Sequence, residues 1–273
     1  MKEEIINIEI ELLLEGIYRI YGYDFRNYAL ASIKRRLNKR MSLEKIDTIS
    51  GLQEKIFHNP EFMQNFFYDL SINITEFFRN PDFFKIFRKK FLPLLKTYPF
   101  IRIWHAGCST GEEVYSMAIL LEEEGYYDRS KIYATDMNEM VVKKAKQGIF
   151  KLESMKKFTQ NYITAGGKEE FSKYYTAHYN NAKFNSSLKR NVVFAQHNLV
   201  TDSSFNEFNV ILCKNVLIYF NKILQENVIN LFDKSLCNFG FLCIGEKESL
   251  NYTSLRYKYK SLDDNQKIYQ KIK

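Results

Sequence analysis

Acidic residues surround a glycine turn in the middle of the chain. The turn Gly107-Cys-Ser-Thr-Gly111 leads directly into Glu112 and Glu113, and Asp136 ends the next apolar run. The turn does not follow the G-x-G-x-x-G pattern of dinucleotide sites, and it lacks the Gly-Lys-Ser/Thr ending of a phosphate-binding loop. Carboxylates at the start of the following helix would repel a pyrophosphate. The residues therefore predict a site for a ligand that carries positive charge and no phosphate.

S-adenosyl-L-methionine has these properties, because it combines a ribose, an ammonium group and a sulfonium and has no phosphate. In nucleotide-binding α/β folds, an acid at the end of the second strand accepts hydrogen bonds from ribose hydroxyls, and we expect this role for Asp136. An alternative role for Asp136 is the N-cap of a helix over residues 139–147. From the residues alone a methyltransferase is the leading interpretation, although phosphate-free nucleotide sites take several ligands.

The glycine turn requires a strand before it and a helix after it. Residues 101–104 have the apolar pattern of a strand, and the helix is indicated by apolar residues at helical spacing: Val114, Met117, Ala118 and Leu121. Further strands are predicted over 131–136, 191–199, 208–213 and 241–245, and helices over 139–147 and 222–239. Strands that alternate with helices predict an α/β fold with a largely parallel, Rossmann-like sheet whose loops gather at one edge.

The N-terminal part of the chain has a different organisation. Helical patterns cover residues 6–21, 25–41 and 42–57, with little strand signal. We expect a small all-helical domain over residues 1–72, because Pro60 and Pro81 bracket a transitional region, and a cofactor-binding α/β domain over residues 73–273. Within the second domain the pattern weakens from residue 150 to 190. We expect a small inserted subdomain there, at about 165–190, with short strands between Phe171 and Tyr179.

The second predicted helix has a basic side. Its apolar stripe consists of Leu30, Ile33, Leu37 and Met41, and we expect the basic residues to project from the opposite side: Arg35, Arg36 and Lys39, with Arg40 at the edge. A solvated helix face would explain this arrangement. A docking surface for an acidic helix or a phosphate backbone would explain it as well.

The composition is that of a globular chain. It has 273 residues, and 45% of them are hydrophobic. The formal net charge of +8 fits an acidic partner, but it does not indicate whether that partner is nucleic acid, anionic lipid or an acidic protein. The acidic N-terminus is unlike a signal peptide and no apolar run approaches the length of a membrane span, so we expect a cytoplasmic protein without membrane insertion. The cysteines lack zinc-ligand spacing, and we expect reduced thiols and no metal site: Cys108, Cys213, Cys237 and Cys243.

Five motifs in order along the chain closely resemble the chemotaxis receptor (protein-glutamate) O-methyltransferases, the CheR-type enzymes that use S-adenosylmethionine to esterify receptor glutamates. The motifs are Asn73-Ile-Thr-Glu-Phe-Phe-Arg79, Ala106-Gly-Cys-Ser-Thr-Gly-Glu-Glu113 with Tyr115-Ser116, Ala134-Thr-Asp136, His197-Asn-Leu199 and Cys213-Lys-Asn-Val-Leu-Ile-Tyr-Phe220. Residues 21–25 and 33–37 also look like the helical domain of this family. The resemblance therefore covers nearly the whole chain.

The resemblance implies S-adenosyl-L-methionine as cofactor, S-adenosyl-L-homocysteine as product and acidic cytoplasmic helices of chemoreceptors as substrate. It implies that Arg79 and Tyr219 border the methyl-transfer site as its catalytic residues, with Asp136 on the ribose and Glu113 at the methionine end. The full set of implied cofactor contacts is Asn73, Thr75, Arg79, Gly107, Glu113, Asp136, Met137, Asn198, Leu199, Lys214 and Asn215. The basic helix would then be a receptor-docking surface formed by Arg35, Arg36, Lys39 and Arg40.

The chain departs from the family in a few places. The family usually has Arg where Lys214 stands, and lysine loses the planar fork needed for bidentate contacts. The family usually has a second Asp where Asn138 stands, and an amide can still form hydrogen bonds without charge. The predicted insertion lacks the glycine-rich hairpin with which some members grip a receptor's C-terminal peptide, so we expect no such tether.

The chemistry needs no general base. A glutamate carboxylate with a reference pKa of about 4.3 is already an ionised nucleophile at neutral pH. Two other functions remain open: a catalytically silent S-adenosylmethionine-binding module that regulates a signalling partner, and a nucleic-acid methyltransferase suggested by the basic charge. The second is disfavoured because Lys214-Asn-Val-Leu stands where amino-group DNA methylases carry an Asn/Asp-Pro-Pro-Tyr/Phe segment. We expect a monomer that does not bind nucleic acid.

Overall fold

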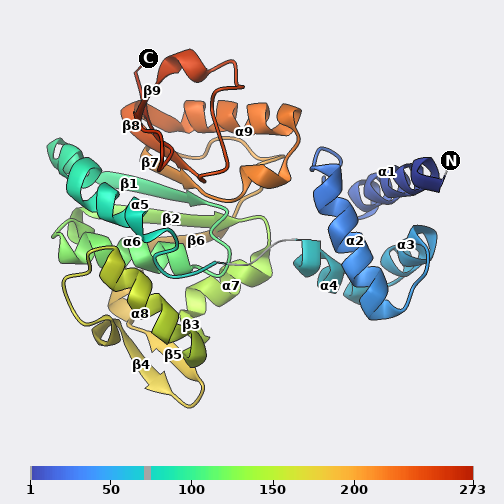
Figure 1. Cartoon of the computed structure of the whole chain (residues 1–273), viewed down its shortest axis with the longest axis horizontal. Helices are drawn as coiled ribbons and strands as arrows, with labels where there is room; N and C mark the ends of the chain where they lie inside the picture. The colour runs from blue at the N-terminus through green and yellow to red at the C-terminus, as the bar shows by residue number, and fades with distance from the viewer. Residues whose placement is uncertain (1, 71–74, 273) are drawn as a thin grey trace. The chain divides into compact units, whose positions relative to one another are not determined.

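The structure of the chain, a computed structural model, describes residues 2–70 and 75–272. Contacts between Cα atoms divide it into two compact units, Met1–Ile72 with Leu217–Val228 and Asn73–Val216 with Ile229–Lys273. Figure 1 shows that the first unit is built mainly of helices and that the second contains the sheets. This is the α/β architecture with a helical N-terminal part that the sequence predicted.

Helices α1 to α4 form the N-terminal part of the helical unit: Lys2–Tyr21, Leu30–Glu44, Ile49–His58 and Pro60–Leu70. Helix α2 begins later than predicted, because the Asp24 carboxylate accepts the backbone N–H of Arg26 at 3.1 Å in a turn before it. The sequence did not predict α4. Its first residue is Pro60, whose fixed φ suits the first position of a helix, so this proline starts a helix and does not interrupt one.

The main sheet has seven strands in the order β6-β2-β1-β7-β8-β10-β9. Their bounds are β1 Ile101–Ala106, β2 Ser130–Asp136, β6 Val192–Gln196, β7 Phe208–Cys213, β8 Leu236–Ile244, β9 Tyr259–Asp263 and β10 Ile268–Lys271. The strands from β6 to β8 run parallel, while β10 is antiparallel to both β8 and β9. The parallel part confirms the predicted fold class.

The central strands of the main sheet consist almost entirely of buried residues. All residues of β7 are buried, and so are all residues of β1 except Arg102. Helix α6 (Glu112–Glu123) packs against the sheet through apolar side chains that include Val114 and Met117. Strands buried on both faces are typical of parallel sheets covered by helices. The other helices of this unit are α5 (Pro81–Ile86), α7 (Glu139–Gln147), α8 (Met155–Thr164) and the C-terminal part of α9 (Lys222–Ser235).

A second, three-stranded sheet has the antiparallel order β3-β5-β4, formed by Ile149–Lys151, Asn181–Phe184 and Tyr175–His178. In Figure 1 it lies with α8 beside the main sheet. It includes β3, which precedes the stretch where we expected the insertion. Of the predicted short strands between Phe171 and Tyr179, residues 171–174 form a 3-10 helix and only residues 175–178 form a strand.

Aromatic rings anchor the segment that follows residue 74 to this small sheet. The Phe77 ring stacks on Phe184 with centroids 4.4 Å apart and meets Phe150 edge-on at 4.9 Å. Phe78 is also fully buried and contacts the ring of Tyr162 at 5.2 Å. The insertion therefore holds in place the residues just before Arg79.

Candidate active site

The glycine turn joins the end of β1 to the start of α6. Gly107 has a φ of 82° and Gly111 a φ of 96°, values that L side chains adopt with strain. The backbone N–H groups of Gly107 and Cys108 both donate to the Thr135 carbonyl at 2.8 Å. A Cβ atom on Gly107 would lie 2.6 Å from Cγ2 of Val216. The turn therefore meets the end of β2 and the segment after β7 at one edge of the sheet.

Asp136 lies at this edge because β1 and β2 run in parallel register, with Ala106 beside Thr135. Its carboxylate accepts the backbone N–H groups of Ser109 and Asn138, each at 3.0 Å. Burial raises the pKa of Asp136, and the backbone hydrogen bonds oppose that rise. A carboxylate has about four acceptor sites, so capacity for ribose hydroxyls remains. Asn138, and not Asp136, caps α7 by accepting the Met140 N–H, so the N-cap interpretation of Asp136 is wrong.

The two glutamates at the start of α6 differ in their surroundings. Glu112 is buried and accepts the Thr110 hydroxyl at 2.7 Å, and burial raises its pKa to about 7. Glu113 accepts a hydrogen bond from Nδ1 of His105 at 2.9 Å. Burial alone would raise the pKa of Glu113, but the His105 bond and the charges of Lys214 and Arg79 outweigh it and lower the pKa. Glu113 is therefore the anionic member of the pair.

Lys214 follows β7 and is buried, with only 6% of its side chain exposed. Its Nζ lies 4.0 Å from Oε2 of Glu113 and 3.8 Å from the centroid of the Phe83 ring. Among the described residues no group accepts a hydrogen bond from this Nζ. Burial lowers the pKa of Lys214, while Glu113 acts in the opposite direction. An ammonium without an acceptor among the residues that the structure describes is suited to an anionic group of a ligand.

A tight turn presents Arg79. The residues on either side, Phe78 and Asn80, have left-handed φ values of 49° and 59°. Phe78 is fixed by its N–H, which donates to Oγ of Ser116 at 2.8 Å, and Asn80 donates through Nδ2 to Gln266 at 2.9 Å. The charge of Arg79 acts on both Glu113 and Lys214. The structure thus brings together three residues that are distant in the sequence.

The end of β6 reaches the same edge. The His197 N–H donates to the Asp136 carbonyl at 3.1 Å, and the side-chain amide of Gln196 donates to the Met137 carbonyl at 3.0 Å. Asn198 uses Oδ1 to accept the Val200 N–H at 3.0 Å and is half-buried, as is Leu199. After β7, Asn215 adopts a left-handed φ of 62°.

The remaining predicted site residues are placed differently. Asn73 lies outside the described residues, and Thr75 is half-buried just before the Phe77 anchor. Tyr219 belongs to the segment Leu217–Val228 of the helical unit. Its backbone carbonyl accepts the Ala29 N–H at 2.8 Å, and the guanidinium carbon of Arg36 lies 4.9 Å from its ring centroid.

The basic residues of α2 do not share one face. Arg35 and Lys39 are exposed, and Arg40 pairs with Asp69 at 2.8 Å and with Glu44 at 3.1 Å. Arg36 is only 5% exposed, so the prediction that it projects into solvent is wrong. Leu30, which we placed in the apolar stripe, is 43% exposed. The face that carries Arg36 is covered by the distant segment around Tyr219 and Phe220, which the helical pattern of α2 cannot reveal.

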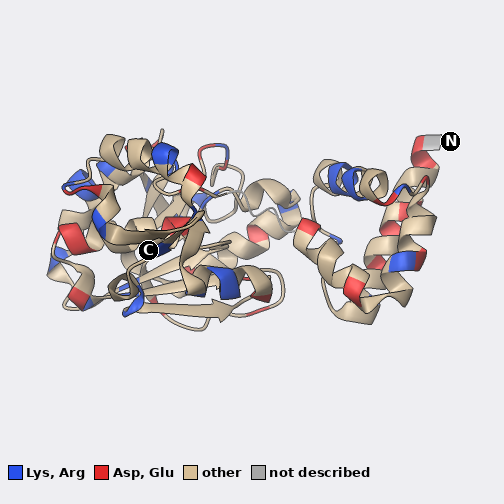
Figure 2. Cartoon of the chain, turned by 90° about the horizontal axis from the view of Figure 1, so that it is seen from below, with Lys and Arg blue, Asp and Glu red and all other residues tan. Residues whose placement is uncertain are grey.

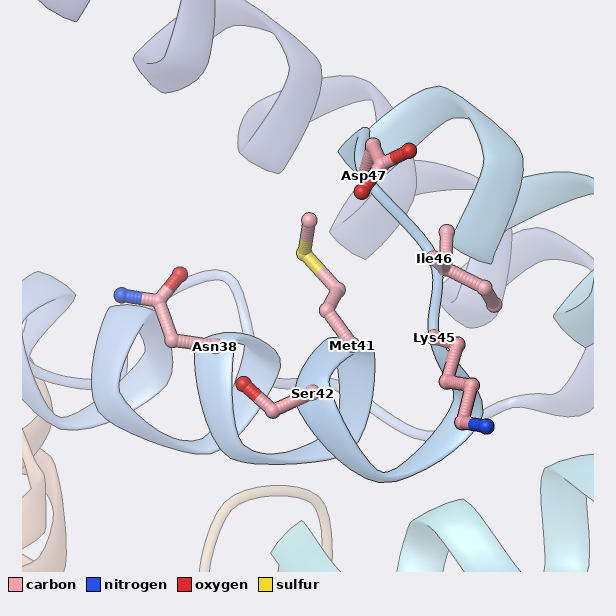
Figure 3. Close-up of a pocket in the computed structure, with 6 residues that line it drawn as sticks. All are labelled: Asn38, Met41, Ser42, Lys45, Ile46 and Asp47. Carbon is pink, nitrogen blue, oxygen red and sulfur yellow. The ribbon is translucent and has the colours of Figure 1, made fainter.

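Figure 2 shows Lys and Arg together on α2 and mainly Asp and Glu on α1. A surface pocket lies at the C-terminal end of α2 and is shown in Figure 3. Its lining residues are Asn38, Met41, Ser42, Lys45, Ile46 and Asp47. All of them belong to the helical unit, and none is among the predicted cofactor contacts.

His105 is a site residue that the sequence reasoning missed. It occupies a buried strand and is 1% exposed, yet it points a ring nitrogen at Glu113. A polar residue among the apolar residues of β1 was the available signal.

A parallel sheet that continues into an antiparallel pair, a glycine turn unsuited to phosphate and an acid at the end of β2 together define an S-adenosyl-L-methionine-dependent methyltransferase domain. Residues 73–266 match the family described as "CheR methyltransferase, SAM binding domain", and residues 8–71 match "CheR methyltransferase, all-alpha domain". The chain belongs to the CheR methyltransferase family, and its cofactor is S-adenosyl-L-methionine. The predicted family and cofactor are confirmed.

Three of its relatives span nearly the same length as this chain. "Putative methyltransferase Cher3" of Pseudomonas putida is 49% identical over 97% of both proteins. A "Chemotaxis protein methyltransferase" of Listeria monocytogenes is 28% identical over 86% of this chain and 87% of that protein. The protein of the same name from Escherichia coli is 28% identical over 88% of this chain and 84% of that protein.

Solved methyltransferase structures are more distant. The DszA carbon methyltransferase is 14% identical, covers 88% of this chain and 48% of that chain, and has a TM-score of 0.37. The N-methyltransferase NodS from Bradyrhizobium japonicum, solved with S-adenosyl-L-homocysteine, is 12% identical, covers 62% of each chain and has a TM-score of 0.33. Within residues 2–70 and 75–272, no helix combines the length and the apolar character needed to cross a membrane.

Proposed function

We propose that this chain transfers methyl groups from S-adenosyl-L-methionine to glutamate side-chain carboxylates of chemotaxis receptors, forming glutamyl methyl esters. The observation that carries the proposal is the similarity, over most of the chain, to proteins named chemotaxis protein methyltransferase. The site supports it because the residues around the glycine turn fit a cationic cofactor, with Asp136 and Glu113 as its acids.

The chain's own residues need only bind the cofactor, orient the glutamate carboxylate and exclude water from the site. When bound, the cofactor supplies a methyl group on a sulfonium sulfur, and a glutamate carboxylate can accept it without first losing a proton, since its reference pKa is about 4.3. Water stabilises a separated carboxylate and cation, so a dry site that aligns the two favours the transfer.

Binding of the cofactor follows from the polar groups at the sheet edge. Asp136 would accept the ribose hydroxyls, and Glu113 would bind the ammonium of the methionine end. Lys214, whose buried Nζ has no acceptor among the described residues, would pair with the carboxylate of that end. The other proposed contacts come from the surrounding loops: Asn73, Thr75, Arg79, Gly107, Met137, Asn198, Leu199 and Asn215.

Arg79 and Tyr219 are the proposed catalytic residues. Arg79 would orient the incoming carboxylate, and the fork geometry of its guanidinium suits that task. The interaction of Arg79 with this carboxylate must stay moderate, because strong binding of the substrate in its ground state would raise the energy barrier to methyl transfer. Tyr219 would donate a hydrogen bond from its hydroxyl.

The proposed substrate is an acidic helix of a chemoreceptor on its cytoplasmic side, and we propose a monomeric enzyme that acts in the cytoplasm. Exposed Arg35 and Lys39 on α2 supply the complementary charge. We propose that binding needs no C-terminal receptor peptide, because Tyr179 and Asn180 join β4 to β5 in place of a glycine-rich turn. A receptor that lacks its last residues should be methylated at an unchanged rate.

The test is incubation with radiolabelled S-adenosyl-L-methionine and receptor-containing membranes. We expect base-labile label on the receptor, because glutamyl methyl esters hydrolyse in alkali. Asp136→Asn should lose both cofactor binding and labelling. Absence of receptor label while calorimetry shows binding of S-adenosyl-L-homocysteine would contradict the proposal.

Tyr219→Phe separates catalysis from cofactor binding. We expect kcat to fall by about 10- to 100-fold while the affinity for S-adenosyl-L-homocysteine stays unchanged, since only the hydroxyl proposed to donate to the acceptor is removed. Arg79→Lys keeps the charge but loses the fork, and it should also lower kcat. Cellular signalling that survives Arg79→Ala but not Asp136→Ala would instead indicate a silent cofactor-binding module.

A further inference from the structure

A buried cluster joins three elements of the sheet unit beside the glycine turn. His105 comes from β1, Glu113 from α6 and Lys214 from the end of β7. Nδ1 of His105 lies 2.9 Å from Oε1 of Glu113, and Nζ of Lys214 lies 4.0 Å from Oε2. The two oxygens of the Glu113 carboxylate are therefore each faced by a nitrogen, one from β1 and the other from the residue that follows β7.

The surroundings of His105 favour one tautomer. Its Nδ1 needs a proton in order to donate to the Glu113 carboxylate, whereas Nε2 is buried and has no partner among the described residues. A proton on Nε2 would be a buried donor without an acceptor among the described residues, which is costly. The arrangement therefore favours the tautomer of His105 that donates from Nδ1 to Glu113.

The other titratable groups near Glu113 cannot replace this hydrogen bond. Lys214 stands too far for a hydrogen bond, at 4.0 Å, and Arg79 acts through its charge. The thiols of Cys213 and Cys243, from β7 and β8, have pKa values that burial raises, so they remain neutral. His105 is the residue that can set the direction of the Glu113 carboxylate.

We infer that His105 is a positioning residue for the cofactor: it locks the Glu113 carboxylate in the orientation that receives the ammonium group of the methionine end. This inference rests on the proposed role of Glu113. A binding carboxylate is effective when its own rotation is restrained by neighbouring groups. The hydrogen bond between Nδ1 of His105 and Oε1 of Glu113, at 2.9 Å, supplies this restraint.

The test measures binding of S-adenosyl-L-homocysteine by calorimetry at pH 8 to wild type, His105→Leu and His105→Asn. The amide nitrogen of asparagine can take the place of Nδ1, while leucine fills the space without a donor. We expect at least about a 10-fold loss of affinity for His105→Leu and less than about a 3-fold loss for His105→Asn. Thermal unfolding of each variant reports whether it is folded.

A double-mutant cycle gives a readout that packing alone would not move. In a Glu113→Gln background, His105→Leu should cause no further loss. Unchanged affinity of folded His105→Leu, or equal losses in the leucine and asparagine variants, would overturn the inference. Failure of wild type to bind would instead refute the proposed cofactor site, and binding without receptor labelling would refute only the proposed substrate.

Discussion

The guanidinium carbon of Arg36 lies 4.9 Å from the centroid of the Tyr219 ring, and both residues belong to the helical unit. Nε and Nη1 of Arg36 are buried and have no hydrogen-bond partner within the described parts of the chain. A charged helix residue is thus in contact with an aromatic ring that lies far away in the sequence. The contact gives Arg36 a structural role that its neighbour Arg35 lacks.

Arg36→Ala should therefore destabilise the protein, by about 1–3 kcal/mol, because it removes a buried side chain and a cation–π contact. Arg35→Ala, on the same helix but exposed, should change stability by less than about 0.5 kcal/mol. Denaturant unfolding of the two variants beside wild type measures both effects. Equal stabilities of the two variants would contradict the assigned role of Arg36.

The exposed basic residues of α2 should control receptor binding. Arg35→Glu combined with Lys39→Glu should raise KM for the receptor by about 10-fold or more and leave the affinity for S-adenosyl-L-homocysteine unchanged. The matched control is Lys89→Glu with Lys90→Glu, which changes the net charge equally at exposed positions of the sheet unit. If the control raises KM to the same extent, net charge and not a docking surface explains the effect.

Ser116 should support the turn that presents Arg79. Its hydroxyl accepts the Phe78 N–H at 2.8 Å and donates to the Glu112 carbonyl at 2.7 Å. Ser116→Ala would leave a buried N–H without a partner, at a cost of about 1–3 kcal/mol, and should also lower kcat. Calorimetric unfolding and receptor labelling measure the two losses. Ser172→Ala, at an exposed position, is the control and should match wild type.

Alanine substitutions at Gly107 and Gly125 distinguish the effect of a close contact at the glycine turn from the effect of backbone strain. Both have positive φ, 82° and 73°, but only a Cβ on Gly107 would meet another atom closely, at 2.6 Å from Val216. Gly125→Ala should cost about 1–2 kcal/mol from strain alone. Gly107→Ala should cost more and weaken binding of S-adenosyl-L-homocysteine at least about 10-fold. Similar losses in stability and affinity would show that the close approach does not matter.

Glu112 predicts a pH dependence of stability. Burial raises its pKa from an ordinary value of 4.5 to about 7 in the folded protein. Between these values the folded state keeps a proton that the unfolded chain has lost, so the contribution of Glu112 to stability falls as pH rises. Glu112→Gln stays neutral and should gain on the order of 3 kcal/mol relative to wild type between pH 4.5 and 7.

Unfolding free energies of wild type and Glu112→Gln at pH 5 and pH 8, without cofactor, measure this gain. Glu122→Gln, at an exposed position of the same helix, should show no such trend. A constant difference between wild type and Glu112→Gln across the pH range would contradict the prediction.

Local patterns were enough to predict the centre of the fold. The apolar run of β1, the glycines of the turn and the helical spacing of α6 are each set by neighbouring residues, and the acid that ends β2 follows from the same alternation of elements. Backbone geometry then brings Gly107 and Asp136 to one edge, because parallel strands end together. The resemblance of its motifs to a known family also predicted the family of the chain and its cofactor, and the comparisons confirm both predictions.

Only the tertiary structure decided how individual polar side chains are used. The period of α2 placed Arg36 in solvent, but a segment far along the chain covers it. His105 belongs to a buried strand, and only the packing of α6 against that strand reveals that Glu113 lies 2.9 Å from its ring. The burial and pairing of a polar side chain depend on which distant segments pack against it. A local sequence pattern contains information only about residues that are neighbours along the chain. The sequence thus determined that the glycine turn and Asp136 meet at one edge of the sheet, and the packing of distant segments determined which side chains lie beside the carboxylates and cations.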